Sequence, residues 1–236
     1  MYCDRCGTLI PEESASCGKC GRPVRAAAPA EAAAAIKEET SVALRDALAI
    51  AKVVLVDPVG ALRPTFDRLG VRKATAAGLA LCVLFATAAA VGIRLVASSG
   101  VGGFLGAMVF GGGVGVGGFL RIVLAALVIP TALVVVSRGL FVLVGRRGPF
   151  GAELFSTGAA LTPLGFAVLA AGILGAGNLE VIALLIFFGM VYLVLMLFRG
   201  LTELGGLSLK AAAPSLPLLL LTSAWLSKVA FVAIFL

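Results

Sequence analysis

The chain has 236 residues, a formal net charge of +7 and an apolar content of 61%. This composition, with a mean hydropathy of +1.12, excludes an ordinary water-soluble protein, because soluble domains hold a much smaller apolar share. Residues 1–73 are the exception, since they contain four of the five cysteines, eleven of the nineteen basic residues and nine of the twelve acidic ones. The excess positive charge therefore lies beside apolar segments, which favours a membrane surface over nucleic acid.

Residues 1–25 contain two CxxCG motifs, one at Cys3 to Gly7 and one at Cys17 to Gly21. Two thiolates from each tight turn complete a tetrahedral zinc site, and the glycines fit the sharp turn of the backbone. The pattern predicts a small zinc ribbon with a structural ion, because four thiolates leave no open coordination position. Disulfides are the alternative if the segment is exported. The predicted ligands are Cys3, Cys6, Cys17 and Cys20.

Residues 26–56 begin as a tether rich in alanine and proline and continue as a predicted helix, either a spacer or a docking element. Asp57 and Pro58 are typical of an N-cap and a first helical residue, so they predict an amphipathic helix over 57–73. Two placements of this helix remain open: flat on the inner leaflet of a membrane, or against the ends of the spans. The residues assigned to the membrane surface are Val59, Leu62, Arg63, Phe66, Arg68 and Leu69.

Residues 74–236 are predicted to form an all-α bundle of five transmembrane helices. Each predicted span is close to or above the roughly 20 residues that cross the hydrocarbon core of a bilayer. Between the first two spans, 100–118 has ten glycines in nineteen residues, which indicates a loop or a re-entrant segment. The predicted spans are 74–98, 120–144, 154–176, 179–198 and 214–236.

Prolines and glycines inside the spans predict how the helices pack. Pro130 and Pro163 each remove a backbone hydrogen bond and are predicted to kink their helices. Gly158, Gly165 and Gly172 recur every seven residues, so they form a smooth stripe that another helix can approach closely. The third span is therefore expected at the centre of a compact bundle.

Basic residues are distributed unevenly about the spans. Nine of them lie before the first span, around the connection between the second and third spans, or between the fourth and fifth spans, which all face one side of the membrane. The ends of the spans that face the other side hold only Arg94 and Arg121. The positive-inside rule then predicts a cytoplasmic N-terminus and a C-terminus on the other side. A reducing cytosol favours zinc over disulfides. The nine residues are Arg63, Arg68, Arg72, Lys73, Arg138, Arg146, Arg147, Arg199 and Lys210.

Residues for catalysis are scarce. The chain has no histidine, and its acidic residues beyond Asp67 are Glu153, Glu180 and Glu203, all near predicted span ends. Because no pair of these residues suggests acid–base work, the sequence predicts no enzyme. Lys228 is the one charge well inside a span, close enough to the C-terminus for its long side chain to reach the interface.

Several short motifs support a resemblance to a known family. Asp57-Pro58 precedes the amphipathic segment, and Gly148-Pro149-Phe150 and Leu161-Thr162-Pro163-Leu164 open the third span. Residues 200–204 and 207–211, which precede the last span, fit the same pattern. Together these motifs make residues 57–236 resemble the prokaryotic branch of the Yip family of five-span proteins. Eukaryotic relatives bind Rab-type GTPases, but their tyrosine-rich cytosolic motif is not evident here. The resemblance therefore implies a polytopic membrane protein and no trafficking role.

Two functions follow from these features. The first is a membrane anchor or scaffold, lying in the lipid bilayer, whose zinc ribbon recruits a cytoplasmic or membrane protein partner. The second is a small-solute transporter, permease or channel, which broken helices favour and the shortage of mid-membrane acids disfavours. A continuous polar lining between the spans would favour transport, whereas a dry interior would favour the scaffold. The sequence indicates no oligomeric state.

Overall fold

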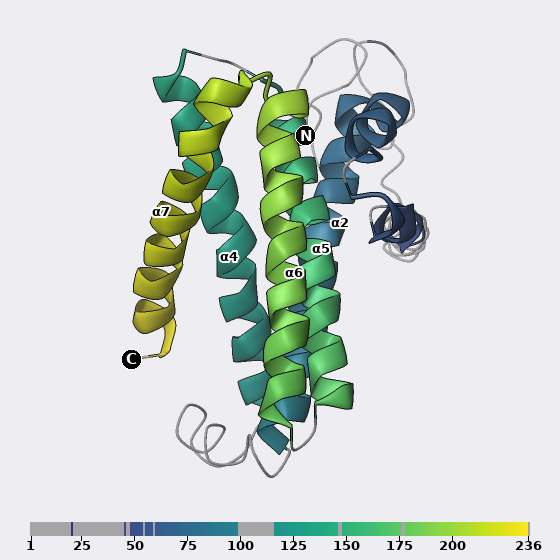
Figure 1. The fold of residues 1–236 in the computed structure, drawn as a ribbon, viewed down its shortest axis with the longest axis vertical. Helices are drawn as coiled ribbons and strands as arrows, with labels where there is room; N and C mark the ends of the chain where they lie inside the picture. Colours follow the sequence, from purple (N-terminus) through teal and green to yellow (C-terminus); the bar gives the residue numbers. More distant parts are fainter. Residues whose placement is uncertain are drawn as a thin grey trace. The chain divides into compact units, whose positions relative to one another are not determined.

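The computed structural model describes residues 20, 45, 48–53, 55–58, 60–98, 116–145, 148–175 and 178–235. All of these except residue 20 belong to one unit, Ala43–Leu236. Regular structure in this part of the chain is helical throughout, and five helices are long and apolar enough to cross a membrane. The predicted all-α fold with five apolar helices of span length is therefore confirmed. The helices are α2 (Leu62–Ser98), α4 (Val116–Leu143), α5 (Phe150–Leu174), α6 (Leu179–Arg199) and α7 (Leu209–Phe235), as Figure 1 shows.

Helices α4, α5 and α7 begin four or five residues earlier than the sequence predicts, with α4 starting at Val116 and its predicted start at 120. Helix α5 starts at Phe150, where Pro149 has the extended backbone of an N-cap residue, and the predicted start was 154. Helix α7 starts at Leu209, five residues before the predicted start, because Ser208 accepts a hydrogen bond from the backbone N–H of Ala211 at 3.3 Å. Prolines do not mark the ends of these helices. Helix α7 continues through Pro214 and Pro217, α4 continues through Pro130, and α5 continues through Pro163.

Helix α2 has two parts that meet at Gly70. The backbone of Gly70 has φ 69° and ψ 163°, a conformation outside the helical region that glycine adopts without steric cost. Residues 62–69 therefore form a short helix, and the spanning part begins at Val71, close to the predicted start at 74. Asp57 does accept a capping-type hydrogen bond, from Gly60 N–H at 2.7 Å, but helix α2 begins at Leu62 and not at Pro58.

The centre of the bundle is the contact between α2 and α5, the most extensive helix pair in the structure. An added Cβ on Gly158 would lie 2.5 Å from the carbonyl oxygen of Gly78, and one on Gly172 would lie 2.6 Å from that of Gly92. Gly165 faces the backbone and ring of Phe85 in the same way. The glycine stripe of α5 therefore lies directly against α2, where only a hydrogen atom fits in place of a side chain.

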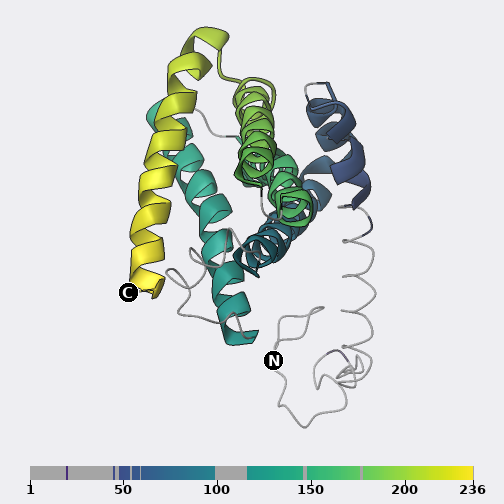
Figure 2. The same cartoon turned by 60° about the horizontal axis from the view of Figure 1, so that its bottom comes forward.

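The remaining helices surround this pair unequally. Helix α5 also contacts α4 and α6, whereas α7 packs mainly against α4. Figure 2 shows α4 and α7 side by side, with α5 and α6 on the other side of α4 from α7. Because it touches three other spans, α5 has the central place that its glycine pattern predicts.

The alternation of the spans gives the bundle two ends. We call proximal the end that contains the start of the α2 span, the α4–α5 connection and the α6–α7 connection; it is at the top of Figure 1. A five-residue π-helix, η1 (Gly200–Leu204), continues α6 at this end. At the distal end, Asn178 caps α6 by accepting hydrogen bonds from Glu180 N–H at 3.0 Å and Val181 N–H at 3.3 Å.

Candidate functional site

The proximal end contains an ion pair between the end of α4 and the start of α5. Arg138 Nη1 donates to Glu153 Oε1 at 2.8 Å and to the carbonyl oxygen of Gly148 at 2.9 Å. The Glu153 side chain is 3% exposed and that of Arg138 is 42% exposed. The carboxylate is thus enclosed by protein while the guanidinium reaches the surface. Glu153 also lies in the first turn of α5, where the helix dipole favours a negative charge.

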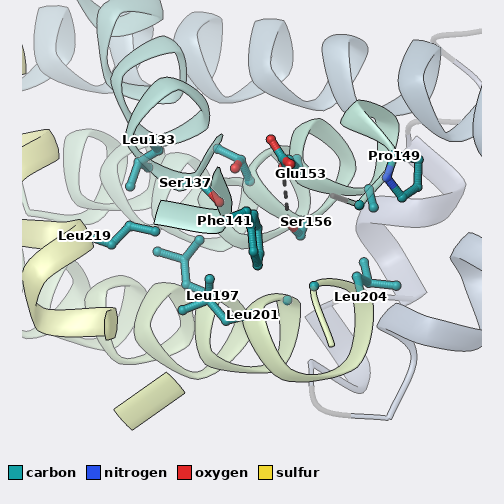
Figure 3. A pocket seen from close by; sticks show the side chains of 15 residues that line it. Leu133, Ser137, Phe141, Pro149, Glu153, Ser156, Leu197, Leu201, Leu204 and Leu219 are labelled. Carbon is teal, nitrogen blue, oxygen red and sulfur yellow. Dashed lines mark hydrogen bonds between the residues drawn. The ribbon is translucent and has the colours of Figure 1, made fainter. Parts of the chain in front are cut away.

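Only one oxygen of this carboxylate takes part in the ion pair. Glu153 Oε2 is fully buried and has no hydrogen-bond partner among the described residues. Glu153 is one of the residues that line a small cavity, of about 20 Å³, that we call the end cavity. Figure 3 shows its surroundings: Glu153 and Ser156 come from α5, Ser137 and Phe141 from α4, and Leu219 from α7. The end cavity therefore combines an acidic oxygen with hydroxyl groups inside an apolar wall.

The π-helix η1 forms the wall of the end cavity opposite α5. Gly205 N–H donates to the carbonyl oxygen of Gly200 at 2.9 Å, across the wider turn of a π-helix. An added Cβ on Gly200 would lie 2.8 Å from Cβ of Ser156, and one on Gly205 would strike the ring of Phe141. The two glycines let this turn approach α4 and α5 closely, and they leave the cavity narrow.

A second polar network ties the start of α2 to the same turn. Arg63 Nε lies 2.9 Å from Asp67 Oδ2, and Arg63 Nη1 donates to the carbonyl oxygen of Glu203 at 2.6 Å. Arg199 Nη1 in turn lies 2.7 Å from Glu203 Oε1. These contacts are part-exposed, so they position the short helix 62–69 against η1 more than they add stability.

The residues predicted for the membrane surface divide into two groups. Leu62 is fully buried, Phe66 stacks its ring 5.9 Å from that of Phe155, and Leu69 packs on the core. These three show the second of the two placements, packing against the spans. Arg63 and Arg68 are exposed, and a role for them at a membrane surface stays a prediction. The side chain of Val59 lies outside the described residues.

The helix predicted before residue 57 is described in part. Residues 48–53 are helical, and Ile50 and Ala51 are buried in the core of the bundle. This part of the segment therefore docks onto the membrane domain. The sequence left open whether it was a spacer or a docking element.

The predicted zinc site lies almost entirely outside the described residues. Of its four cysteines, only Cys20 is described, in a turn. The described part of the chain contains no cluster of three or more histidine, cysteine or acidic residues suited to a metal ion. Zinc binding by Cys3, Cys6, Cys17 and Cys20 stays a prediction of the sequence.

Three further residues inside the spans have no described contact with the end cavity. Cys82 is buried, and its sulfur lies 3.3 Å from the place that a Cβ on Gly158 would take, so it is part of the α2–α5 contact. Lys228 is exposed on α7. Buried Thr162 donates its hydroxyl to the carbonyl oxygen of Gly158 at 2.8 Å, which satisfies it within its own helix.

The pairing of Arg138 with Glu153 is a feature of the proximal end that the sequence does not predict. Arg138 was counted only as a positive charge and Glu153 only as an isolated acid. The available signal was their placement: a base in the last turns of one span and an acid in the first turn of the next, with a short connection between them. Antiparallel neighbours joined in this way bring both side chains to one end of the bundle.

The described residues at the proximal end bring a buried carboxylate and several hydroxyl groups together. Ser156 donates its hydroxyl to the carbonyl oxygen of Glu153 at 3.1 Å, so it is not activated by a base. Comparison with protein-family models, with curated proteins and with solved structures found no match for this chain.

Proposed function

We propose that this protein is a membrane anchor that recruits a protein partner through its N-terminal segment, residues 1–25. The observation that carries the proposal is the apolar packing of the described spans. The buried polar residues other than the end cavity's Ser137, Glu153, Ser156 and Thr157 are Thr162 and Ser223, on two different helices. A bundle without a continuous polar path suits an anchor, whereas transport needs polar groups along a path through the membrane.

Two further features support an anchoring role. The α2–α5 contact is closed by glycines that leave no room for a side chain, so this interface has little freedom to open. The segment before α2 also docks on the bundle through Ile50 and Ala51. A partner held by residues 1–25 would then stay close to the membrane domain, on a tether of about twenty-five residues.

A transporter is the second candidate, and the observation in its favour is the end cavity beside a π-helix. π-helices are frequent at functional sites, and a buried acid within a membrane domain is costly to keep. The cavity's volume of about 20 Å³ suits a water molecule but no organic solute. The end cavity therefore supports the transporter less well than the apolar packing of the spans supports the anchor.

The proposed orientation puts the proximal end in the cytoplasm. Arg63, Arg68, Arg72 and Lys73 surround the break in α2, and Lys210 begins α7 at the same end. Towards the distal end, the basic residues of the described spans are Arg94, Arg121 and Lys228. The positive-inside rule supports a cytoplasmic N-terminal segment, with zinc held by reduced thiols.

The test is crosslinking in native membranes with a matched pair of variants of the full chain. Cys3→Ser with Cys6→Ser removes two predicted zinc ligands, and Ser14→Ala with Ser16→Ala changes the same segment without touching a ligand. The cysteine variant is expected to lose specific crosslinked partners while its abundance in the membrane stays at the wild-type level. The serine variant is expected to keep the partners.

Two results would count against recruitment through residues 1–25. One is that the cysteine variant loses zinc yet recovers the same partners as the wild type. The other is that the purified chain in sealed vesicles conducts a solute flux that Glu153→Gln abolishes. In that case the end cavity would be part of a transport path, and the transporter would become the leading candidate.

A further inference from the structure

Glu153 Oε2 is a charged acceptor that the protein encloses without supplying a donor. The side chain is 3% exposed, and its other oxygen, Oε1, already accepts from Arg138. Buried carboxylate oxygens in native structures almost always have a hydrogen-bond partner, either protein or ordered water. The donor for Oε2 is therefore expected in the space beside it.

That space has the size and the lining of a hydration site. The end cavity's volume of about 20 Å³ exceeds the roughly 10–15 Å³ that one water molecule requires. Ser137 on α4 and Thr157 on α5 line it together with Glu153, and both are buried. Neither hydroxyl makes a hydrogen bond to another group in the described part of the chain. Three residues with an unpaired polar atom thus line one small space, and three is the number of groups that a buried water usually bonds.

The charges of Arg138 and Glu153 and the volume of the end cavity favour a water molecule over a metal ion or an organic ligand. Arg138 already balances Glu153, so a metal cation would add a net positive charge to a site walled by Phe141, Leu197 and Leu201. The volume excludes an organic molecule. We propose that the end cavity is a buried hydration site, where a water molecule donates to Glu153 Oε2 and bonds the hydroxyls of Ser137 and Thr157. This water joins α4 to α5 beside the ion pair, and it is independent of recruitment through residues 1–25.

The test is X-ray radiolytic footprinting of the full chain, in which bound water is converted to hydroxyl radicals that label the side chains next to it. Phe141 lines the cavity and is 3% exposed, while Phe85 in the α2–α5 contact is 2% exposed and does not line it. Phe141 is expected to be labelled several times faster than Phe85. Equal slow labelling of both would show a dry cavity and overturn the proposal.

Two variants test the assigned partners. Ser137→Ala with Thr157→Val removes both hydroxyls, and it is expected to lower the labelling of Phe141 to that of Phe85. Thr162→Val is the matched control, since Thr162 is equally buried in α5 but lies outside the cavity, and it is expected to leave Phe141 unchanged. Rapid labelling of Phe141 that persists in the double variant would refute the assigned partners. If the double variant also changes the labelling of Phe85, a density map of the wild type decides, by showing a water at hydrogen-bond distance from Oε2 or an empty cavity.

Discussion

Glu153 illustrates how one side chain depends on two others from a neighbouring helix. Its carboxylate is held by Arg138 through Oε1, its second oxygen is buried without a partner among the described residues, and Glu153 lines the end cavity together with Ser137. A buried ion pair is not in itself a strong source of stability, because removing two charges from water offsets most of their attraction. Removing only one partner lowers the stability, because the other charge is then buried without a counter-charge.

The first prediction concerns this asymmetry. Arg138→Leu is expected to lower the free energy of unfolding by about 1–3 kcal/mol, because it leaves a buried carboxylate without a partner. Arg138→Leu combined with Glu153→Leu is expected to recover most of that loss, since both charges are then absent. Thermal unfolding in detergent measures both. As a control, Asp67→Ala breaks an exposed pair and is expected to change stability little. A double variant less stable than Arg138→Leu would contradict this account.

The second prediction concerns the four cysteines of residues 1–25. Metal analysis of the purified chain is expected to find one zinc per molecule, with sulfur–zinc distances of about 2.3 Å by X-ray absorption. Cys17→Ser is expected to lower zinc affinity strongly, whereas Cys82→Ser is expected to leave the zinc content unchanged because Cys82 is buried between α2 and α5. A zinc-free protein with disulfides between these cysteines would refute the ribbon.

At the scale of the helices, the sequence predicted the number of spans but not all of their ends. Hydropathy averages over about 20 residues, so it locates a span well and its first turn poorly. Helix α7 shows why: Pro214 looked like a start, but Ser208 caps the helix a turn and a half earlier. The pairing of Arg138 with Glu153 escaped for a related reason. Charge counting assigns each residue to a side of the membrane and says nothing of which helices are neighbours.

The third prediction tests the α2–α5 contact with one added methyl group. Gly158→Ala and Gly172→Ala are each expected to destabilise the bundle by about 1–3 kcal/mol, because the new Cβ would meet the backbone of Gly78 or Gly92. Gly139→Ala in α4 is the matched control, as a Cβ there meets no atom within 4 Å, and alanine favours a helix. Thermal unfolding compares the three. Equal stability of Gly158→Ala and Gly139→Ala would mean that the close contact contributes little.

At the scale of the whole molecule, the odd number of span-length helices puts the start of α2 and the end of α7 at opposite ends of the bundle. The short helix 62–69, the break at Gly70 and the π-helix η1 all lie at the proximal end. The described polar networks gather there as well. The side of the membrane on which the proximal end lies therefore matters for the proposed function.

The fourth prediction tests that orientation. Gly148→Cys and Glu180→Cys place a thiol at the proximal and the distal end, at positions exposed or open enough to react. In sealed vesicles, a membrane-impermeant reagent on the cytoplasmic side is expected to label 148 and spare 180, with sites assigned by peptide mass. Labelling of both positions from one side would contradict the five-span arrangement. Labelling of 180 alone would reverse the orientation.

The glycine-lined contact between α2 and α5 also has a consequence for biogenesis. Spans enter the membrane in chain order, and helices associate after they are inserted. α2 is inserted first, yet its best partner is the third span, so Gly78 and Gly92 face lipid or the insertion machinery until α5 emerges. A chain truncated after α4 would lack the pair on which the core is built. Assembly of this domain therefore waits for synthesis to pass Leu174, more than a hundred residues into the chain.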